Sequence, residues 1–150
     1  MNILALDLGS HCGWALKDGQ YILSGVQLFD LQRGESPGMR YLRFKKWLQI
    51  MCDPIRDIKA IYYEQPHNRG GHATALLNGM VAIILYFAAE WQIETCPVHS
   101  GTLKKFATGS GSASKDDMIE AAKKFKSDVT DDNEADALYL LAFAQTEIGG

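Results

Sequence analysis

Residues 2–29 read NILALDLGSHCGWALKDGQYILSGVQLF and contain three apolar runs separated by short turns. The segment 9–12 interrupts the first run, and Lys17, Asp18 and Gly19 follow the second. Short apolar runs bounded by turn residues are typical of β-strands, and short turns join antiparallel neighbours. The sequence therefore predicts that the fold opens as a three-stranded antiparallel meander.

Helices and strands alternate after this meander. Apolar side chains recur at helical spacing between residues 37 and 55, and AIYYE at 60–64 is a strand that Pro66 stops. Further elements are expected: a mostly apolar helix buried on several sides (72–91), a strand (93–98), a helix that begins at a Ser114–Asp117 capping box, and a last helix (130–146). This order predicts an α/β fold with three layers, a mixed five-stranded sheet with helices on both faces.

Composition limits the class of protein. A chain of 150 residues that is 47% hydrophobic is long enough for a single domain, residues 1–150, with a sizeable core. Its three cysteines are an odd and scattered set, which argues against a disulfide framework. The longest apolar stretch, 79–89, is shorter than the roughly 18 residues that a membrane crossing needs, and no basic leader precedes Met1. We expect an intracellular, cytoplasmic protein with no membrane association.

Charge is segregated along the chain although the net charge is only -3. Basic residues are in excess in segments 33–59 and 99–126, whereas segment 127–150 carries acids and no lysine or arginine. Such runs can simply be solvated helix faces. An acidic centre flanked by basic segments is also what a metal-dependent phosphodiesterase needs.

Two carboxylates end apolar strands of the predicted sheet. Asp7 lies inside the run 3–8, near its end at Gly9, and Glu64 closes the strand 60–64. In sheets of this kind sites form outside the carboxyl ends of strands, and a buried carboxylate must be paired, protonated or bound to a cation. No lysine or arginine lies within four residues of either acid on its strand. The pair predicts a site for a hard cation such as Mg²⁺, and the alternative is that each acid turns to solvent.

The last predicted helix supplies further oxygen ligands. Asp131 and Glu134 are interpreted as first-turn acids that the helix dipole favours. Asp136 lies beyond the first turn between small neighbours, and Asp132 and Asn133 project beside it. With the two strand acids, this helix face offers four donor positions, enough for two metal ions that activate water and stabilise a leaving oxygen.

The segments ILALDLG at 3–9, YYEQP at 62–66, GSGSASK at 109–115 and DDNEADAL at 131–138, in this order, resemble the RuvC-type Holliday junction resolvases of the ribonuclease H-like superfamily. The resemblance covers nearly the whole chain and is strongest to compact phage members. It implies a ribonuclease H-like fold and a Mg²⁺- or Mn²⁺-dependent endonuclease, two ions per site, that acts as a homodimer on four-way DNA junctions.

The resemblance also implies roles for individual residues. Expected metal ligands are Asp7, Glu64, Asp136 and, at the fourth place, Asp132 or Asn133; charge balance favours Asp132. Lys115 and Lys104 match basic positions that the family uses toward the scissile phosphate and the DNA backbone, and Lys115 is expected to take part in catalysis. The expected DNA contacts are Lys104, Lys105, Lys115, Arg69 and His67.

The sequence departs from the bacterial pattern at two places. The bacterial family has an aromatic residue three positions after the strand glutamate, where this chain has His67, and an acid three positions before the last aspartate, where this chain has Asn133. The alternatives are an inactive module that binds branched DNA and a relative that acts on RNA, forks or flaps. A nucleotide-binding kinase or actin-like fold is disfavoured because no second phosphate-binding hairpin follows residue 20.

Helix 72–91 is apolar around most of its surface, beyond what one sheet face can cover. We therefore expect it to pack partly against a second copy of the chain, because two-fold dimers are the commonest oligomers and a junction has two-fold symmetry. The alternative is a wholly internal helix.

Overall fold

The computed structural model describes residues 1–67 and 70–149. Within these described residues, five strands and five α-helices, with one short 3-10 turn, follow one another in this order: β1 (Asn2–Asp7), β2 (His11–Asp18), β3 (Tyr21–Leu28), α1 (Gly38–Met51), η1 (Pro54–Arg56), β4 (Ile58–Glu64), α2 (Gly71–Trp91), β5 (Glu94–Val98), α3 (Ser100–Thr108), α4 (Lys115–Ala122) and α5 (Asp132–Gly149).

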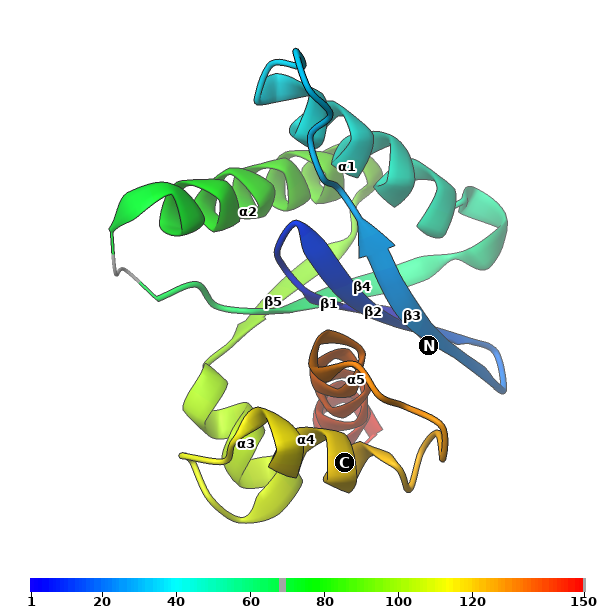
Figure 1. Cartoon of the computed structure of the whole chain (residues 1–150). Coiled ribbons are helices and arrows are strands. Elements are labelled where there is room, and N and C mark those ends of the chain that lie inside the picture. The colour runs from blue at the N-terminus through cyan, green and yellow to red at the C-terminus, as the bar shows by residue number, and fades with distance from the viewer. Residues whose placement is uncertain (68–69, 150) are drawn as a thin grey trace.

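The strands form one mixed sheet in the order β3-β2-β1-β4-β5 (Figure 1). The pairs β1–β2 and β2–β3 are antiparallel, so the predicted meander is confirmed. The pairs β1–β4 and β4–β5 are parallel, and their connections pass through helices. The prediction of a mixed five-stranded sheet is therefore also confirmed.

Helices cover both faces of the sheet (Figure 1), as predicted. Alternate residues of each strand point to opposite faces. Leu4 and Leu6 of β1 belong to a core cluster with α1 and α2, whereas Ile3 and Ala5 belong to a second cluster with α3, α4 and α5. These two clusters make the three-layer architecture.

Element boundaries differ from the predictions at several ends. Helix α1 ends at Met51 and not near residue 55, because Asp53 begins a separate turn by accepting a hydrogen bond from the backbone N–H of Ile55. Strand β4 begins at Ile58, earlier than predicted, because Ile58 pairs with Asn2 of β1. The capping box of α4 is present as predicted, with Ser114 and Asp117 each accepting a backbone hydrogen bond from the other.

Helix α2 is less buried than the sequence predicts. Only Met80, Ile84, Phe87 and Ala88 are buried along its 21 residues, on the face that packs on the sheet. Tyr86 is 63% exposed, so the expectation of burial on several sides is wrong for one chain alone. Among the residues that the structure describes, α2 is the one helix long and apolar enough to cross a membrane. Since one of its faces packs on the sheet, this property alone does not indicate a membrane protein.

Helix α5 lies directly on the meander at Gly13 of β2. A Cβ atom on Gly13 would lie 1.9 Å from the backbone oxygen of Asn133, so any larger residue would push the first turn of the helix away. Glu134 also holds this turn: its carboxylate accepts hydrogen bonds from the Ser24 hydroxyl and the Lys126 ammonium, both at 2.7 Å. These contacts fix the position of the acidic end of α5 over the sheet.

Candidate metal centre

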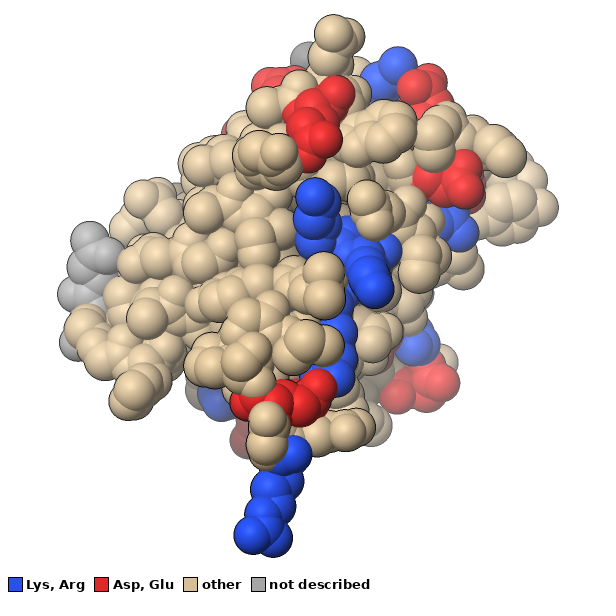
Figure 2. Space-filling view, turned by 90° about the horizontal axis from the view of Figure 1, so that it is seen from above, with Lys and Arg blue, Asp and Glu red and all other residues tan. Residues whose placement is uncertain are grey.

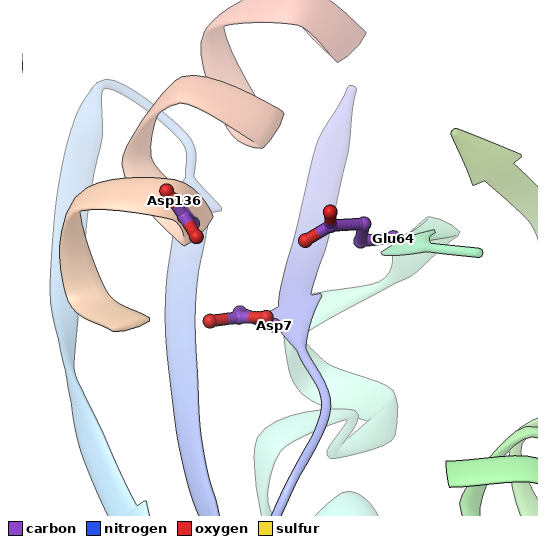
Figure 3. A group of neighbouring side chains, drawn as sticks. All are labelled: Asp7, Glu64 and Asp136. Atoms are coloured by element: carbon purple, nitrogen blue, oxygen red, sulfur yellow. The ribbon is translucent and has the colours of Figure 1, made fainter. Parts of the chain in front are cut away.

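Three of the predicted carboxylates come together at one edge of the sheet (Figure 3). One oxygen each of Asp7, Glu64 and Asp136 lies within 4.8 Å of the other two. Asp7 ends β1, and Glu64 ends its parallel neighbour β4, so both side chains leave the sheet at the same edge. Asp136 lies one turn into α5 and points toward them (Figure 3).

Burial raises the pKa of all three acids, and repulsion by neighbouring carboxylates raises the pKa of Asp7 and Asp136 further. Burial raises the pKa of Asp7 well above its ordinary value, and the nearby Asp136, Glu64 and Asp132 carboxylates raise it further. Burial, followed by Glu64 and Asp132, raises the pKa of Asp136 to about 7. Burial also raises the pKa of Glu64. The cluster therefore holds more negative charge than its own surroundings stabilise.

Bases from other elements partly offset this charge. Lys104 of α3 opposes the rise in the pKa of both Glu64 and Asp136, and His99 and Lys115 each oppose the rise at one of them. The sequence shows no base near Asp7 or Glu64 on their own strands, and these cations come from segments that follow β5. They leave the pKa of the three acids raised, so the site still lacks positive charge.

The donor set fits a hard divalent cation. Three carboxylates without a histidine or cysteine are the ligands that Mg²⁺ or Mn²⁺ prefers. Oxygens that share one Mg²⁺ at about 2.1 Å lie up to about 4.2 Å apart. The 4.8 Å limit of the cluster exceeds this only slightly, so small side-chain rotations would close it around an ion.

Asp132 lies at the edge of this cluster and not within it. Its Oδ2 atom is 3.7 Å from the Lys115 Nζ, and its charge raises the pKa of both Asp7 and Asp136. Asn133 presents its backbone to Gly13. The assignment of Asp132 as the fourth ligand stays a prediction.

Asp131 and Glu134 have structural contacts at the start of α5. Asp131 accepts hydrogen bonds from the backbone N–H groups of Asn133 at 2.7 Å and Glu134 at 3.3 Å, so it caps the helix. Glu134 is buried and bound to Ser24 and Lys126. The first-turn interpretation is therefore incomplete for Glu134, whose carboxylate anchors α5 to β3. No local pattern marks this role, because Ser24 lies 110 residues away in the sequence.

The predicted DNA contacts are spread around the acidic cluster. His67 and Lys104 line a cavity of about 440 Å³ that also includes Glu64 and Ser100. The His67 Nε2 is 2.7 Å from the Ser100 Oγ, and its ring lies edge-on to that of His99. Sequence reasoning missed His99 and Ser100, since nothing in the sequence connects them to His67.

The remaining basic candidates lie further out. Lys115 is 84% exposed at the start of α4, within reach of Asp132. Lys105 is exposed on α3, about 100° around the helix axis from Lys104, which lines the cavity. Arg69 lies outside the described residues.

The protonation of the cluster predicts how stability depends on pH and metal. Because the pKa of each acid is higher in the folded state, the metal-free protein binds more protons folded than unfolded. Its stability should therefore fall as pH rises from about 4 to about 7. A fixed Mg²⁺ concentration of about 100 times its Kd at pH 8 should raise the Tm by about 5 °C or more at pH 8, and by less at pH 6, where protonation of the carboxylates weakens Mg²⁺ binding.

Thermal denaturation at both pH values, with Mg²⁺ or with EDTA, measures this effect. Asp57→Asn is the matched control, because the Asp57 carboxylate is exposed at the far end of β4 and its left-handed backbone suits asparagine. An Mg²⁺ effect of equal size at both pH values would contradict the prediction.

Comparisons with known proteins identify the fold. No protein-family model and no curated protein matches the chain. The solved structure of Thermus thermophilus RuvC is similar over 99% of this chain and 97% of its own, with a TM-score of 0.77 and 20% identity. The same Thermus protein in complex with a Holliday junction substrate matches with 17% identity over 98% and 96% of the two chains, also at 0.77.

A eukaryotic structure is similar as well. The yeast mitochondrial Holliday junction resolvase Ydc2 matches with a TM-score of 0.61 and 11% identity, over 92% of this chain and 75% of its own. These likenesses, together with the sheet order and the helices on both faces, establish the ribonuclease H-like fold of the RuvC structures for this chain.

Proposed function

We propose that this protein is a metal-dependent endonuclease that cleaves branched DNA, with the Holliday junction as its principal substrate. The observation that carries the proposal is the convergence of Asp7, Glu64 and Asp136 at the strand ends. The fold gives it support, because the Thermus RuvC structure that matches nearly the whole chain includes a Holliday junction substrate. We further propose that residues 1–150 act as a single nuclease domain.

The chemistry follows from the residues around the cluster. Asp7, Glu64 and Asp136 would hold Mg²⁺ or Mn²⁺, which supplies activated water and stabilises the leaving oxygen of a phosphodiester. We propose two ions per site, with Asp132 as the additional ligand. A DNA substrate and three free cysteines favour an intracellular location.

Basic side chains on the same side would bind the DNA backbone. Lys104 lies beside Glu64 in the cavity, and Lys115 lies beyond Asp132. Lys105, His67 and Arg69 complete the proposed set of contacts. Phosphate contacts of this kind position the substrate through charge and add salt dependence to binding.

Lys115→Ala should weaken junction binding or turnover by roughly tenfold without unfolding the protein. The Lys115 ammonium is exposed, so its removal costs little stability, but one phosphate contact is lost. The slope of log affinity against log salt should fall by about 1. Lys59→Ala at the far end of β4 is the matched control. If the cleavage rate and the salt slope of binding were both unchanged, Lys115 would be a solvated side chain that does not contact the DNA.

We propose a homodimer in which α2 contacts a second copy. Leu85 and Tyr86 are exposed on α2, and Figure 2, which views the molecule from the side of α1 and α2, shows a largely uncharged surface crossed by a narrow band of basic side chains. A two-fold dimer would present two acidic clusters to the two symmetric strands of a junction.

Light scattering at micromolar concentration should give the mass of two chains. Leu85→Glu should give monomers because it places a charge in the proposed contact. Ile55→Glu is the matched control, since Ile55 is exposed but lies in the turn after α1. A wild-type monomer that cleaves junctions at the full rate would contradict the dimer.

A labelled four-way junction and a duplex of the same sequence test the function. Cleavage of the junction with Mg²⁺, no cleavage with EDTA and little cleavage of the duplex are expected. Equal cleavage of both DNAs would contradict junction specificity. Junction binding without any cleavage would indicate an inactive module that binds branched DNA. Fork, flap and RNA substrates in the same assay compare the remaining substrate classes.

A further inference from the structure

Strand β3 is an open edge of the sheet, at the end of the strand order opposite β5 (Figure 1). Its eight residues, YILSGVQL, contain no charged residue and no proline. Natural edge strands usually carry such residues, or are short or covered, because their outward N–H and C=O groups can pair with another chain. Strand β3 has neither a charge nor a proline to prevent that pairing.

Large apolar side chains are exposed along this edge. Tyr21 is 66% exposed and Ile22 is 50% exposed, and Leu23 and Leu28 are similarly open. The strand is held on one side only, by β2, from Tyr21 to Leu28. Both its backbone edge and its side chains are therefore available to a partner.

A groove runs beside β3 on the face that α5 covers. It has a volume of about 570 Å³, and its apolar lining comes from Ile22, Leu23, Phe125 and Leu138. A volume of this size accommodates side chains of a bound segment. The groove thus offers an apolar pocket next to an unpaired strand.

Two lysines line the same groove. The Lys124 ammonium lies 5.1 Å from the ring centre of Phe125 and 5.2 Å from that of Tyr139. No carboxylate of the described residues lies within 4.0 Å of it, whereas Lys126 is bound to Glu134. Lys124 is therefore the cation that remains open to an acidic ligand.

We propose that β3 binds an extended acidic segment of a partner protein, which adds a sixth strand to the sheet. Backbone hydrogen bonds to β3 would give affinity, and alternate side chains would give specificity. Apolar side chains of the segment would enter the groove beside Ile22, and a carboxylate would pair with Lys124. This inference goes beyond the proposed nuclease activity and does not rest on it.

A second copy of the chain fits this edge less well. Strand β3 has no acidic residue to offer to the lysines of another copy. Pairing through β3 would also bring two lysine-lined grooves together, and like charges at an interface oppose association. An acidic partner would pair with Lys124, which a second β3 would leave without a carboxylate.

The probe is a fluorescein-labelled ten-residue peptide in which valine and isoleucine alternate with glutamate. A matched peptide carries lysine in place of each glutamate. Fluorescence anisotropy with the full chain should show at least about tenfold tighter binding of the acidic peptide. Amide hydrogen exchange of Tyr21–Leu28 should slow when that peptide is bound.

Two variants locate the contact. Lys124→Glu should weaken binding of the acidic peptide about tenfold or more, and Ile22→Ser should weaken it through the groove. Lys123→Glu is the matched control, because Lys123 pairs with Glu120 and the groove lining does not include it; its affinity should stay within about twofold. Junction cleavage should be unchanged in all three variants.

Three results would overturn the proposal: equal or no binding of the two peptides, exchange protection outside β3, or equal affinity of Lys124→Glu and the wild type. Protection of β3 that rises with protein concentration, without peptide, would assign the edge to a second copy instead. These readouts do not involve DNA, so a failure of the proposed nuclease activity leaves them interpretable.

Discussion

Replacing Asp7 with asparagine is expected to lower junction cleavage by at least about 1,000-fold and to leave junction binding intact or tighter. The Asp7 carboxylate forms the cluster together with those of Glu64 and Asp136, so its loss removes a charged ligand from the proposed metal site. Metal stabilisation of a phosphoryl transition state is worth several kcal/mol, and about 1.4 kcal/mol corresponds to a tenfold change in rate. Removing one negative charge also reduces the repulsion of DNA phosphates.

Single-turnover cleavage with Mg²⁺, together with junction binding in EDTA, separates these effects. Asp7→Asn should also stabilise the metal-free protein at neutral pH, because burial and neighbouring carboxylates raise the pKa of Asp7. Asp57→Asn serves again as the control. If binding and thermal stability were lost together with cleavage, Asp7 would have a structural role and the metal assignment would be wrong.

Asp132→Asn is expected to reduce cleavage by about 30-fold or more, whereas Asn133→Ala should change it by less than about threefold. Asp132 lies 40° around the helix from Asp136 and Asn133 lies 60° away on the other side. The charge of Asp132 acts on Asp7 and Asp136, and a Mg²⁺ site gains more from a carboxylate than from an amide. The competing view is that Asp132 is a first-turn acid, whose loss costs only a few tenths of a kcal/mol in stability.

Cleavage rates of the two variants at saturating Mg²⁺ and Mn²⁺ decide between these views. Because Asp132 also lies 3.7 Å from Lys115, the double variant Asp132→Asn with Lys115→Ala is needed as well. If Asp132 acts only through Lys115, the double variant will cleave no more slowly than Lys115→Ala. Full activity of Asp132→Asn would show that the Asp132 carboxylate is not a metal ligand.

Most elements of the fold that were predicted correctly depend on patterns within a short stretch of sequence. The meander depends on short turns between apolar runs, and the capping box depends on two residues three positions apart. The error at α2 has a physical cause as well. Composition shows that a helix is apolar, but it does not show how many neighbours cover it. Helix α2 packs on the sheet and against α1, and much of its remaining surface is exposed.

The candidate site shows the same difference between features that a local sequence pattern reveals and contacts that only the fold creates. Asp7 and Glu64 were recognisable because a carboxylate at the end of an apolar strand is costly unless it has a partner. Pairings that join distant segments had no such signal, among them Glu134 with Ser24 and His67 with Ser100. Each residue of those pairs is ordinary in its own segment, and only the folded chain brings it to its partner.

The separation of the three clustered carboxylates along the chain has a consequence for the timing of activity during synthesis. Asp7 and Glu64 belong to the first half of the chain, whereas Asp136 belongs to α5, which follows every strand. Ribosomes add about 5–20 residues per second, so several seconds pass between the synthesis of Glu64 and that of Asp136. During that interval the nascent chain carries two of the three carboxylates, and it lacks the helix that completes the cluster. On the proposed function, unfinished chains, and those degraded from the C-terminal side, should therefore not cleave the DNA around them.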